Sequence, residues 1–198
     1  MSGGMGSDDD DHGPGGPGDS GIQLGEILAG DIRIESLIEQ GGMGAVYRGR
    51  QQGLKRDVAV KVVRPSLARD ASIRRRFEEE GPLLAELEHP NTVRVLQQGR
   101  TASGALFLVM ELLRGETLRE RIAAKGCLSV ERTLDIGIQI CASLAEAHAK
   151  GLVHRDMKPE HVFLQNHAGT PDFVRVFDFG IARRVEESEE ARVTAPGT

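Results

Sequence analysis

Hydrophobic residues change their spacing along the chain, and each change marks a different kind of predicted element. From Ile32 to Ile38 they recur two or four residues apart, and a glycine run at 41–44 then separates them from a second strand-like stretch. This pattern predicts a hairpin with a glycine-rich tip. Residues 58–63 are apolar and mostly β-branched except for Lys61, so they predict a third strand.

From Asp70 to about residue 87 the spacing becomes helical, and Asp70 is a suitable N-cap. The expected apolar face consists of Ile73, Phe77, Leu84 and Leu87. Pro82 lies inside this segment, where proline removes an amide donor and collides with the preceding turn. We therefore expect a kink or break near Gly81. Residues 93–96 and 106–110 predict two further strands.

Beyond Gly115 the pattern is mainly helical. Residues 117–124 predict a short helix, and Ser129 is a suitable N-cap for a long helix that ends at Gly151. Three- and four-residue spacing on this long helix is shown by Leu134, Ile138, Cys141, Leu144, Ala145 and His148. We expect His148 to pack in the core rather than to bind a ligand. Residues 174–177 predict one more strand.

Composition and charge exclude several classes of protein. The 198 residues include 25 Lys and Arg, 30 Asp and Glu, and 4% aromatic residues, which disfavours a dedicated nucleic-acid-binding protein. The chain has no run of about 20 apolar residues and does not begin like a signal peptide, so we expect a cytoplasmic protein without a membrane segment. Residues 1–30 contain an acidic run and a Gly/Pro stretch, which predict a disordered tail.

The two cysteines, Cys127 and Cys141, lie outside any CxxC or Cys/His pattern. A disulfide scaffold and a structural zinc site are therefore not expected. We expect both to be reduced, buried thiols.

The first half of the chain has two stretches that suggest chemistry. The glycines within residues 39–46 would let backbone amides approach phosphate oxygens. A dinucleotide-binding loop is excluded, because that motif opens a helix whereas residues 46–50 continue as a strand. Lys61 must pair or face a ligand, because an uncompensated buried ammonium is costly. Its candidate partner is Glu80, and an edge-strand lysine reaching solvent is the alternative.

Two further stretches follow the long helix. The loop at 154–159 contains Asp156, which can accept a hydroxyl proton, and Lys158, which can neutralise a transferring phosphoryl group. Asp178 follows a predicted strand and offers the oxygen ligand that Mg²⁺ prefers. Each stretch is a modest signal, but the four in this order are specific.

With these stretches in place, residues 31–198 resemble the eukaryotic-like protein kinases, specifically the bacterial Ser/Thr protein kinases. The matching segments are Gly44-Ala45-Val46, Val58-Ala59-Val60-Lys61, residues 77–91 ending in His89-Pro90-Asn91, His154-Arg155-Asp156 and Asp178-Phe179-Gly180. The resemblance implies an α+β, protein-kinase-like fold. It would have a five-stranded antiparallel small lobe with one helix over residues 31–113 and a truncated helical large lobe over 114–198.

The resemblance also implies ATP and Mg²⁺ as cofactors and the Ser or Thr hydroxyl of a protein as the phosphoryl acceptor. Lys61 would hold the α- and β-phosphates and pair with Glu80, while Asp156 would deprotonate the acceptor. Lys158 would lie near the γ-phosphate, and the metal positions would be Asp178 and His161. The nucleotide-binding residues would be Gly41, Gly42, Gly44, Val46, Ala59, Lys61, Met110, Glu111, Leu113 and Phe163. A phosphate on Thr194 would pair with Arg155 and order the activation loop, the alternative being an ordinary exposed threonine.

Four departures from the family pattern keep other interpretations open. Glu39 replaces the first loop glycine, His161 replaces the asparagine that binds the second Mg²⁺, and Pro82 follows Glu80 closely. The sequence given stops before the remaining large-lobe helices, so we expect the helix at 129–150 to expose an apolar stripe, which marks either a site for a partner protein or an aggregation liability. The alternatives to an active kinase are a pseudokinase that binds a nucleotide or a protein, and a gene remnant without function.

Overall fold

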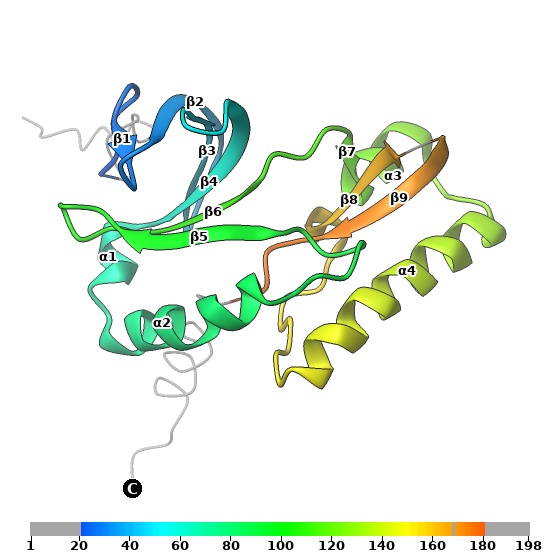
Figure 1. Ribbon diagram of the computed structural model, residues 1–198. Coiled ribbons are helices and arrows are strands. Elements are labelled where there is room, and N and C mark those ends of the chain that lie inside the picture. The colour runs from blue at the N-terminus through cyan, green and yellow to red at the C-terminus, as the bar shows by residue number, and fades with distance from the viewer. Residues whose placement is uncertain (1–20, 168, 181–198) are drawn as a thin grey trace, which may run out of the picture.

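A computed structural model describes residues 21–167 and 169–180, arranged as a small lobe and a part of a large lobe (Figure 1). The small lobe is built on a six-stranded antiparallel sheet with the order β1-β2-β3-β4-β6-β5. Its strands are β1 (Ile27–Leu28), β2 (Ile32–Gly41), β3 (Gly44–Gln51), β4 (Arg56–Val63), β5 (Val95–Arg100) and β6 (Leu106–Glu111). The glycine-tipped hairpin, the third strand and the two later strands are therefore confirmed.

The sheet has one strand more than predicted. The added strand β1 pairs with β2, and it lies within the segment expected to be a disordered tail. Ile22 and Leu28 are 2% and 3% exposed, so residues 21–30 contribute to the core of the small lobe. The expectation was wrong for this part because two apolar side chains suffice to anchor a short strand against a preformed sheet edge. Residues 1–20 lie outside the described part of the chain.

Glycine is required at the start of β3. A Cβ atom on Gly44 would lie 1.9 Å from the backbone oxygen of Val62 on β4, closer than any side chain tolerates. The close approach lets the hairpin tip fold over the end of β4. Gly41 and Gly42, by contrast, are exposed and have open space around them.

Alternation along β4 explains its single lysine. Val58, Val60 and Val62 are fully buried in a core on one face of the sheet. Because side chains of a strand alternate, Ala59 and Lys61 point to the opposite face, which turns toward α2 and the large lobe. Lys61 is thus on a strand that is buried on both faces, as its sequence context indicated.

Helix α2 (Ala71–Ala85) crosses the sheet beside β5, after the short helix α1 (Pro65–Ala68). The Asp70 carboxylate accepts hydrogen bonds from the amides of Ser72 and Ile73 at 2.7 and 3.3 Å, which confirms the predicted N-cap. The predicted apolar face is also confirmed, since all four of its members are buried.

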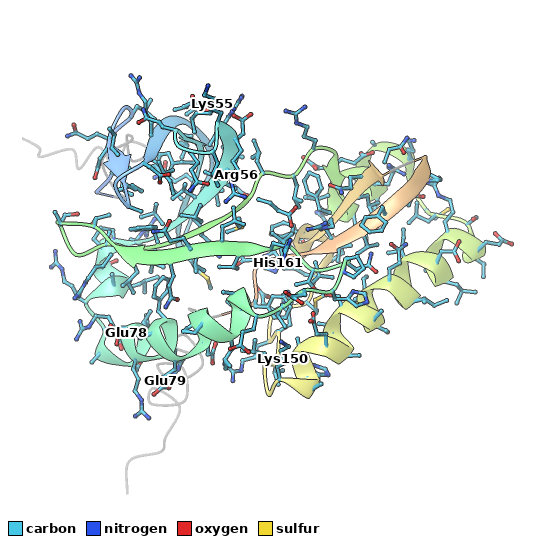
Figure 2. All side chains as sticks on the ribbon, in the orientation of Figure 1. Lys55, Arg56, Glu78, Glu79, Lys150 and His161 are labelled. Atoms are coloured by element: carbon cyan, nitrogen blue, oxygen red, sulfur yellow. The ribbon has the colours of Figure 1, made fainter. Side chains whose placement is uncertain are left out.

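The predicted break near Gly81 is wrong, because α2 continues through Pro82 to Ala85. Pro82 lies on the exposed side of the helix, one turn after the exposed Glu78. The carbonyl group that loses its amide partner therefore faces water, while packing of the opposite face holds the helix together. Figure 2 shows Glu78 and Glu79 on this outer side of α2.

The large-lobe part combines a small sheet, β7-β8-β9, with two helices. Its elements are β7 (Glu116–Thr117), α3 (Leu118–Lys125), α4 (Val130–Ala149), the 3-10 turn η1 (Pro159–His161), β8 (Val162–His167) and β9 (Thr170–Val176). Thr117 and Glu120 form a capping box on α3, and Ser129 caps α4. Gly151, with φ 76°, ends the long helix as predicted.

Helix α4 has apolar residues on two faces, and the stripe singled out from the sequence is mainly the outer one. Ile136 and Ala147 pack into the core on β9, whereas Leu134 and Ile138 are 60% and 67% exposed. His148 is exposed, so the expectation of a core histidine was wrong. Cys127 and Cys141 are exposed free thiols, which corrects the expectation that they are buried.

The segment between α2 and β5 fastens the two lobes together. The side chain of Asn91 donates to the backbone oxygen of Val174 at 2.8 Å, and its backbone oxygen accepts from Val176 at 2.7 Å. The hydroxyls of Thr92 and Ser143 lie 2.7 Å apart, which joins the same segment to α4. These bonds hold the end of β9 and the middle of α4 to the segment that follows α2.

Candidate active site

Three charged side chains from distant parts of the sequence line one cavity between the lobes. The ammonium of Lys61 on β4 contacts the Oδ1 atom of Asp178, which follows β9. Asp156, from the loop after α4, lines the same cavity, together with Met43, Phe179 and Gly180. The predicted convergence of Lys61, Asp156 and Asp178 is therefore confirmed. The cavity holds about 30 Å³ in this closed arrangement.

Asp178 is held as a carboxylate by its neighbours. Burial raises the pKa of this carboxyl group, but the Lys61 ammonium outweighs burial and holds the pKa below its usual value. Its backbone has φ 61°, and Arg155 in the facing loop has φ 60°. Left-handed backbone at two non-glycine residues is a local strain of the kind found at functional sites.

The loop at 154–159 is fixed by a buried histidine. His154 is 2% exposed, its Nε2 lies 2.9 Å from the backbone oxygen of Phe177, and its Nδ1 accepts from the amide of Asp156 at 3.3 Å. A carbonyl oxygen only accepts, so Nε2 carries the proton and the ring is neutral. Burial lowers the pKa of His154 accordingly. The ring also packs at a tilted angle of 41° against Phe179, with centroids 4.6 Å apart, so this histidine contacts both the loop at 154–159 and the segment after β9.

Lys158 and Asp156 are presented together. The Nζ atom of Lys158 lies 3.2 Å from Oδ2 of Asp156. The lysine side chain is 40% exposed while the aspartate is 7% exposed, so the carboxylate is buried at the cavity and the ammonium beside it reaches solvent. This arrangement suits a proton acceptor next to a group that neutralises a phosphoryl oxygen.

His161 lies at the centre of the interface between the lobes (Figure 2). Its Nδ1 is 2.8 Å from the backbone oxygen of Asp156, so Nδ1 is the donor and Nε2 carries the lone pair. That nitrogen lies 3.4 Å from Oδ2 of Asp178, and burial lowers the pKa of the ring. One imidazole nitrogen and one carboxylate oxygen thus face the same point and fit a divalent cation whose remaining ligands come from phosphate and water. Among the described residues no group of three or more His, Cys, Asp or Glu side chains could hold a metal by itself.

The predicted pairing of Lys61 with Glu80 is wrong in this structure. Glu80 Oε1 accepts instead from the guanidinium of Arg155 at 2.8 Å, while Lys61 contacts Asp178. The helix presents the carboxylate toward the cleft as expected, but a planar guanidinium of the facing loop reaches it first. The counter-charge of the Lys61 ammonium is therefore Asp178 and not Glu80.

Only some of the residues predicted to contact a purine line a cavity in this structure. A second cavity is lined by residues that include Lys61, Leu108, Met110, Phe177 and Asp178, so Met110 borders the cleft next to the two charged residues. Ala59 is opposite Met110 in the sheet, and Phe163 lies edge-on to Phe177 with ring centroids 6.3 Å apart. The other predicted purine contacts, Val46, Glu111 and Leu113, are half-buried and do not line either cavity.

Several polar residues that fix the site carried no local sequence signal. Asp172 binds Arg121 at 2.8 Å and also Arg132, and is held below its usual pKa because these arginines outweigh the effect of burial. Glu146 accepts from the amides of Glu88 and His89 at 2.9 Å each. Their partners lie more than 30 positions away, so only the fold reveals them.

Two further predictions concern the phosphorylation site and a membrane segment. Thr194, the predicted phosphorylation site, lies outside the described residues. Across the described ranges, none of the helices combines the length and apolar character that crossing a bilayer requires.

Comparisons with known proteins agree with this geometry. Residues 32–198 match the sequence profile of the protein kinase domain family. The Ser/Thr protein kinase pkn3 of Myxococcus xanthus is 37% identical over 172 residues, which cover 87% of this chain and 31% of that protein. PknB of Mycobacterium leprae is 39% identical over 171 residues, covering 85% and 27%.

The fold comparison gives the same result. The crystal structure of the Mycobacterium tuberculosis PknI kinase domain superposes with a TM-score of 0.73 at 30% identity. The match covers 82% of this chain and 62% of that kinase domain. The matched part of the chain spans 20–31% of the length of the first curated relatives. Sequence and fold together show that the chain belongs to the protein kinase family, as a bacterial-type Ser/Thr protein kinase domain of which a part is present.

Proposed function

We propose that this domain binds Mg-ATP in the cavity between its lobes and transfers the γ-phosphoryl group to Ser or Thr hydroxyls of proteins. The observation that carries the proposal is the convergence of Lys61, Asp156 and Asp178 on one cavity. Family membership implies ATP and Mg²⁺, and the residues present fit both.

Each charged residue has a distinct role in the proposed reaction. Asp156 accepts the proton of the acceptor hydroxyl, because its carboxylate is buried at the base of the cavity. Lys158 stabilises negative charge that develops on the transferred group. Lys61 binds the phosphates that precede it, and Asp178 and His161 would hold the metal. A bound magnesium ion supplies neutralisation of phosphate charge and orientation of the leaving group.

The direct contact between Lys61 and Asp178 closes the phosphate site. Phosphate oxygens and a metal must replace this contact, because they need the same ammonium and the same carboxylate. Nucleotide binding is therefore coupled to a small separation of β4 from the segment after β9.

A second candidate function is nucleotide binding without phosphoryl transfer. It is favoured by the pairing of Glu80 with Arg155, which leaves Lys61 without its expected partner. It is also favoured by His161, since imidazole nitrogen is a poorer magnesium ligand than oxygen.

Thermal stabilisation by Mg-ATP and transfer of labelled γ-phosphate to dephosphorylated casein separate the candidates. A kinase is stabilised, loses stabilisation in Lys61→Met, and loses transfer in Asp156→Asn. The exposed Lys125→Met and Asp135→Asn variants should behave as wild type in both assays. Stabilisation without transfer in wild type supports the second candidate, and the absence of both contradicts each of them.

A further inference from the structure

One ion pair between the lobes has no role in the reaction proposed above. Arg175 on β9 contacts the Glu111 carboxylate at the end of β6, where the small lobe passes into the large lobe. The Arg175 side chain is 11% exposed, and the Glu111 side chain is 32% exposed. The two residues are 64 positions apart in the sequence, so the pair joins the lobes and not neighbouring turns.

Both partners lie next to the walls of the proposed purine site. Arg175 is directly opposite Phe163 in the pairing of β9 with β8. Opposite residues of an antiparallel pair share a face of the sheet, so Arg175 and Phe163 face the small lobe together. Glu111 follows Met110, which lies opposite Ala59 in the small-lobe sheet. The ion pair thus connects the wall formed by β4 and β6 to the wall formed by β8 and β9.

Glu111 is held from a second direction. Its Oε1 accepts from the amide of Arg94 at 2.7 Å, and its own amide donates to the oxygen of Arg94 at 3.2 Å. The carboxylate is therefore an anchored point on the hinge, to which the guanidinium of β9 binds.

Arg175 depends on Glu111 more than Glu111 depends on Arg175. Burial and the neighbouring Arg94 lower the pKa of Arg175, and its Nε atom has no hydrogen-bond partner among the described residues. Glu111 is its counter-charge, whereas Glu111 retains the Arg94 amide and partial access to water. Removing Glu111 should therefore cost more than removing Arg175, because it leaves a buried charge uncompensated.

We infer that the Glu111–Arg175 ion pair sets the spacing between the two purine walls and acts as a positioning pair for the adenine of the bound nucleotide. The inference rests on the proposed function, since it assigns adenine to this side of the cleft. Lys61 and Asp178, the side chains proposed to bind the phosphates and the metal, contact each other and take no part in this ion pair. The pair should consequently affect recognition of the base and leave recognition of the phosphates unchanged.

Affinities for Mg-ATP and for magnesium tripolyphosphate, measured on the whole 198-residue chain, test this division. We expect Arg175→Gln to weaken Mg-ATP about tenfold and to change tripolyphosphate less than about twofold, since a misplaced wall affects only the base. Arg175→Lys, which keeps the charge, should restore part of the loss. Arg33→Gln is the matched control, because Arg33 is an exposed arginine on β2, which β3 and β4 separate from β6 and Glu111.

A parallel measurement of melting temperature tests the asymmetry. Glu111→Gln should be less stable than Arg175→Gln, and the double variant should be more stable than Glu111→Gln alone. Equal losses of affinity for ATP and for tripolyphosphate in Arg175→Gln, or an equal effect of Arg33→Gln, overturn the inference.

Hydrogen exchange of the hinge amides 110–113 in nucleotide-free protein separates this inference from the proposed function. Loss of protection in Arg175→Gln, but not in Arg33→Gln, supports an ion pair that fixes the hinge. If the wild-type chain then binds no nucleotide, that failure of binding contradicts the proposed function alone. Unchanged protection in Arg175→Gln overturns the inference whatever the nucleotide affinities are.

Discussion

The variant Glu80→Gln tests whether Lys61 needs a carboxylate from helix α2 in order to bind the nucleotide. In this structure Glu80 binds Arg155 at 2.8 Å and Lys61 binds Asp178. Replacing the Glu80 carboxylate should therefore destabilise the fold without weakening Mg-ATP, because the ammonium keeps its partner.

The magnitude follows from the burial of the Glu80–Arg155 pair. The side chains are 19% and 33% exposed, which places it between surface pairs, worth up to about 1 kcal/mol, and fully buried pairs, whose disruption costs about 3 kcal/mol or more. We expect a loss of about 1–2 kcal/mol. For a chain of this length that corresponds to a decrease in melting temperature of roughly 2–8 °C.

A double-mutant cycle provides the assay. The free energies of unfolding of Glu80→Gln, Arg155→Gln and the double variant should show a coupling of about 1 kcal/mol, whereas the cycle of Glu80→Gln with Lys61→Met should show almost none. Mg-ATP affinity of Glu80→Gln should stay within about twofold of wild type. Strong coupling to Lys61, or a loss of affinity as large as that of Lys61→Met, would refute the observed pairing.

Other charged and apolar side chains of the two lobes lead to four more predictions. Burial lowers the pKa of His154 in the folded protein below 6.5, so the free energy of unfolding should fall as the pH drops below about 6.5. In urea titrations this fall should be smaller for His154→Gln than for wild type, whereas the exposed His148→Gln should behave as wild type. Asp172→Asn should cost about 1–2 kcal/mol in urea unfolding, because it removes the carboxylate that Arg121 and Arg132 share, while Arg121 keeps Glu116 and Arg132 is 41% exposed; an unchanged free energy of unfolding would contradict this. ATP should bind more tightly with Mn²⁺ than with Mg²⁺, and His161→Asn should reduce the ratio of the two affinities about tenfold. The same ratio in wild type and His161→Asn would argue against a metal-binding imidazole. Ile138→Glu should reduce self-association in light scattering without lowering the melting temperature, because this side chain on the outer face of α4 is 67% exposed; a large loss of stability would show that the face is covered.

The elements of the small lobe could be predicted because their signals are local. Alternation indicated the strands, Asp70 marked the start of α2, and the glycine run marked the hairpin tip. The strand β1 was missed since its stability comes from pairing with β2 and not from its own two residues. The break at Pro82 was predicted from the local cost of proline, which packing of α2 overrides.

The site was predictable in its composition but less so in its pairings. Lys61, Asp156 and Asp178 were identified from the order of short stretches, and they do meet in one cavity. Which carboxylate each cation binds depends on small differences in reach between loops, and these are not encoded in spacing. The sequence therefore assigned Glu80 to Lys61, whereas Arg155 holds it.

The face of α4 illustrates a second limit. Helical spacing identifies apolar stripes, but α4 carries two, and the spacing does not say which stripe packs on the sheet. His148 lies on the outer stripe and is exposed for that reason.

Backbone amide shifts during a titration with Mg-ATP test the central claim most directly. The account predicts that the largest changes fall on residues 41–46 of the hairpin tip, on the strand around Lys61, on the hinge at 110–113 and on the loops around Asp156 and Asp178. Changes confined to other surfaces, or shifts that persist undiminished in Lys61→Met, would contradict a nucleotide site between the lobes.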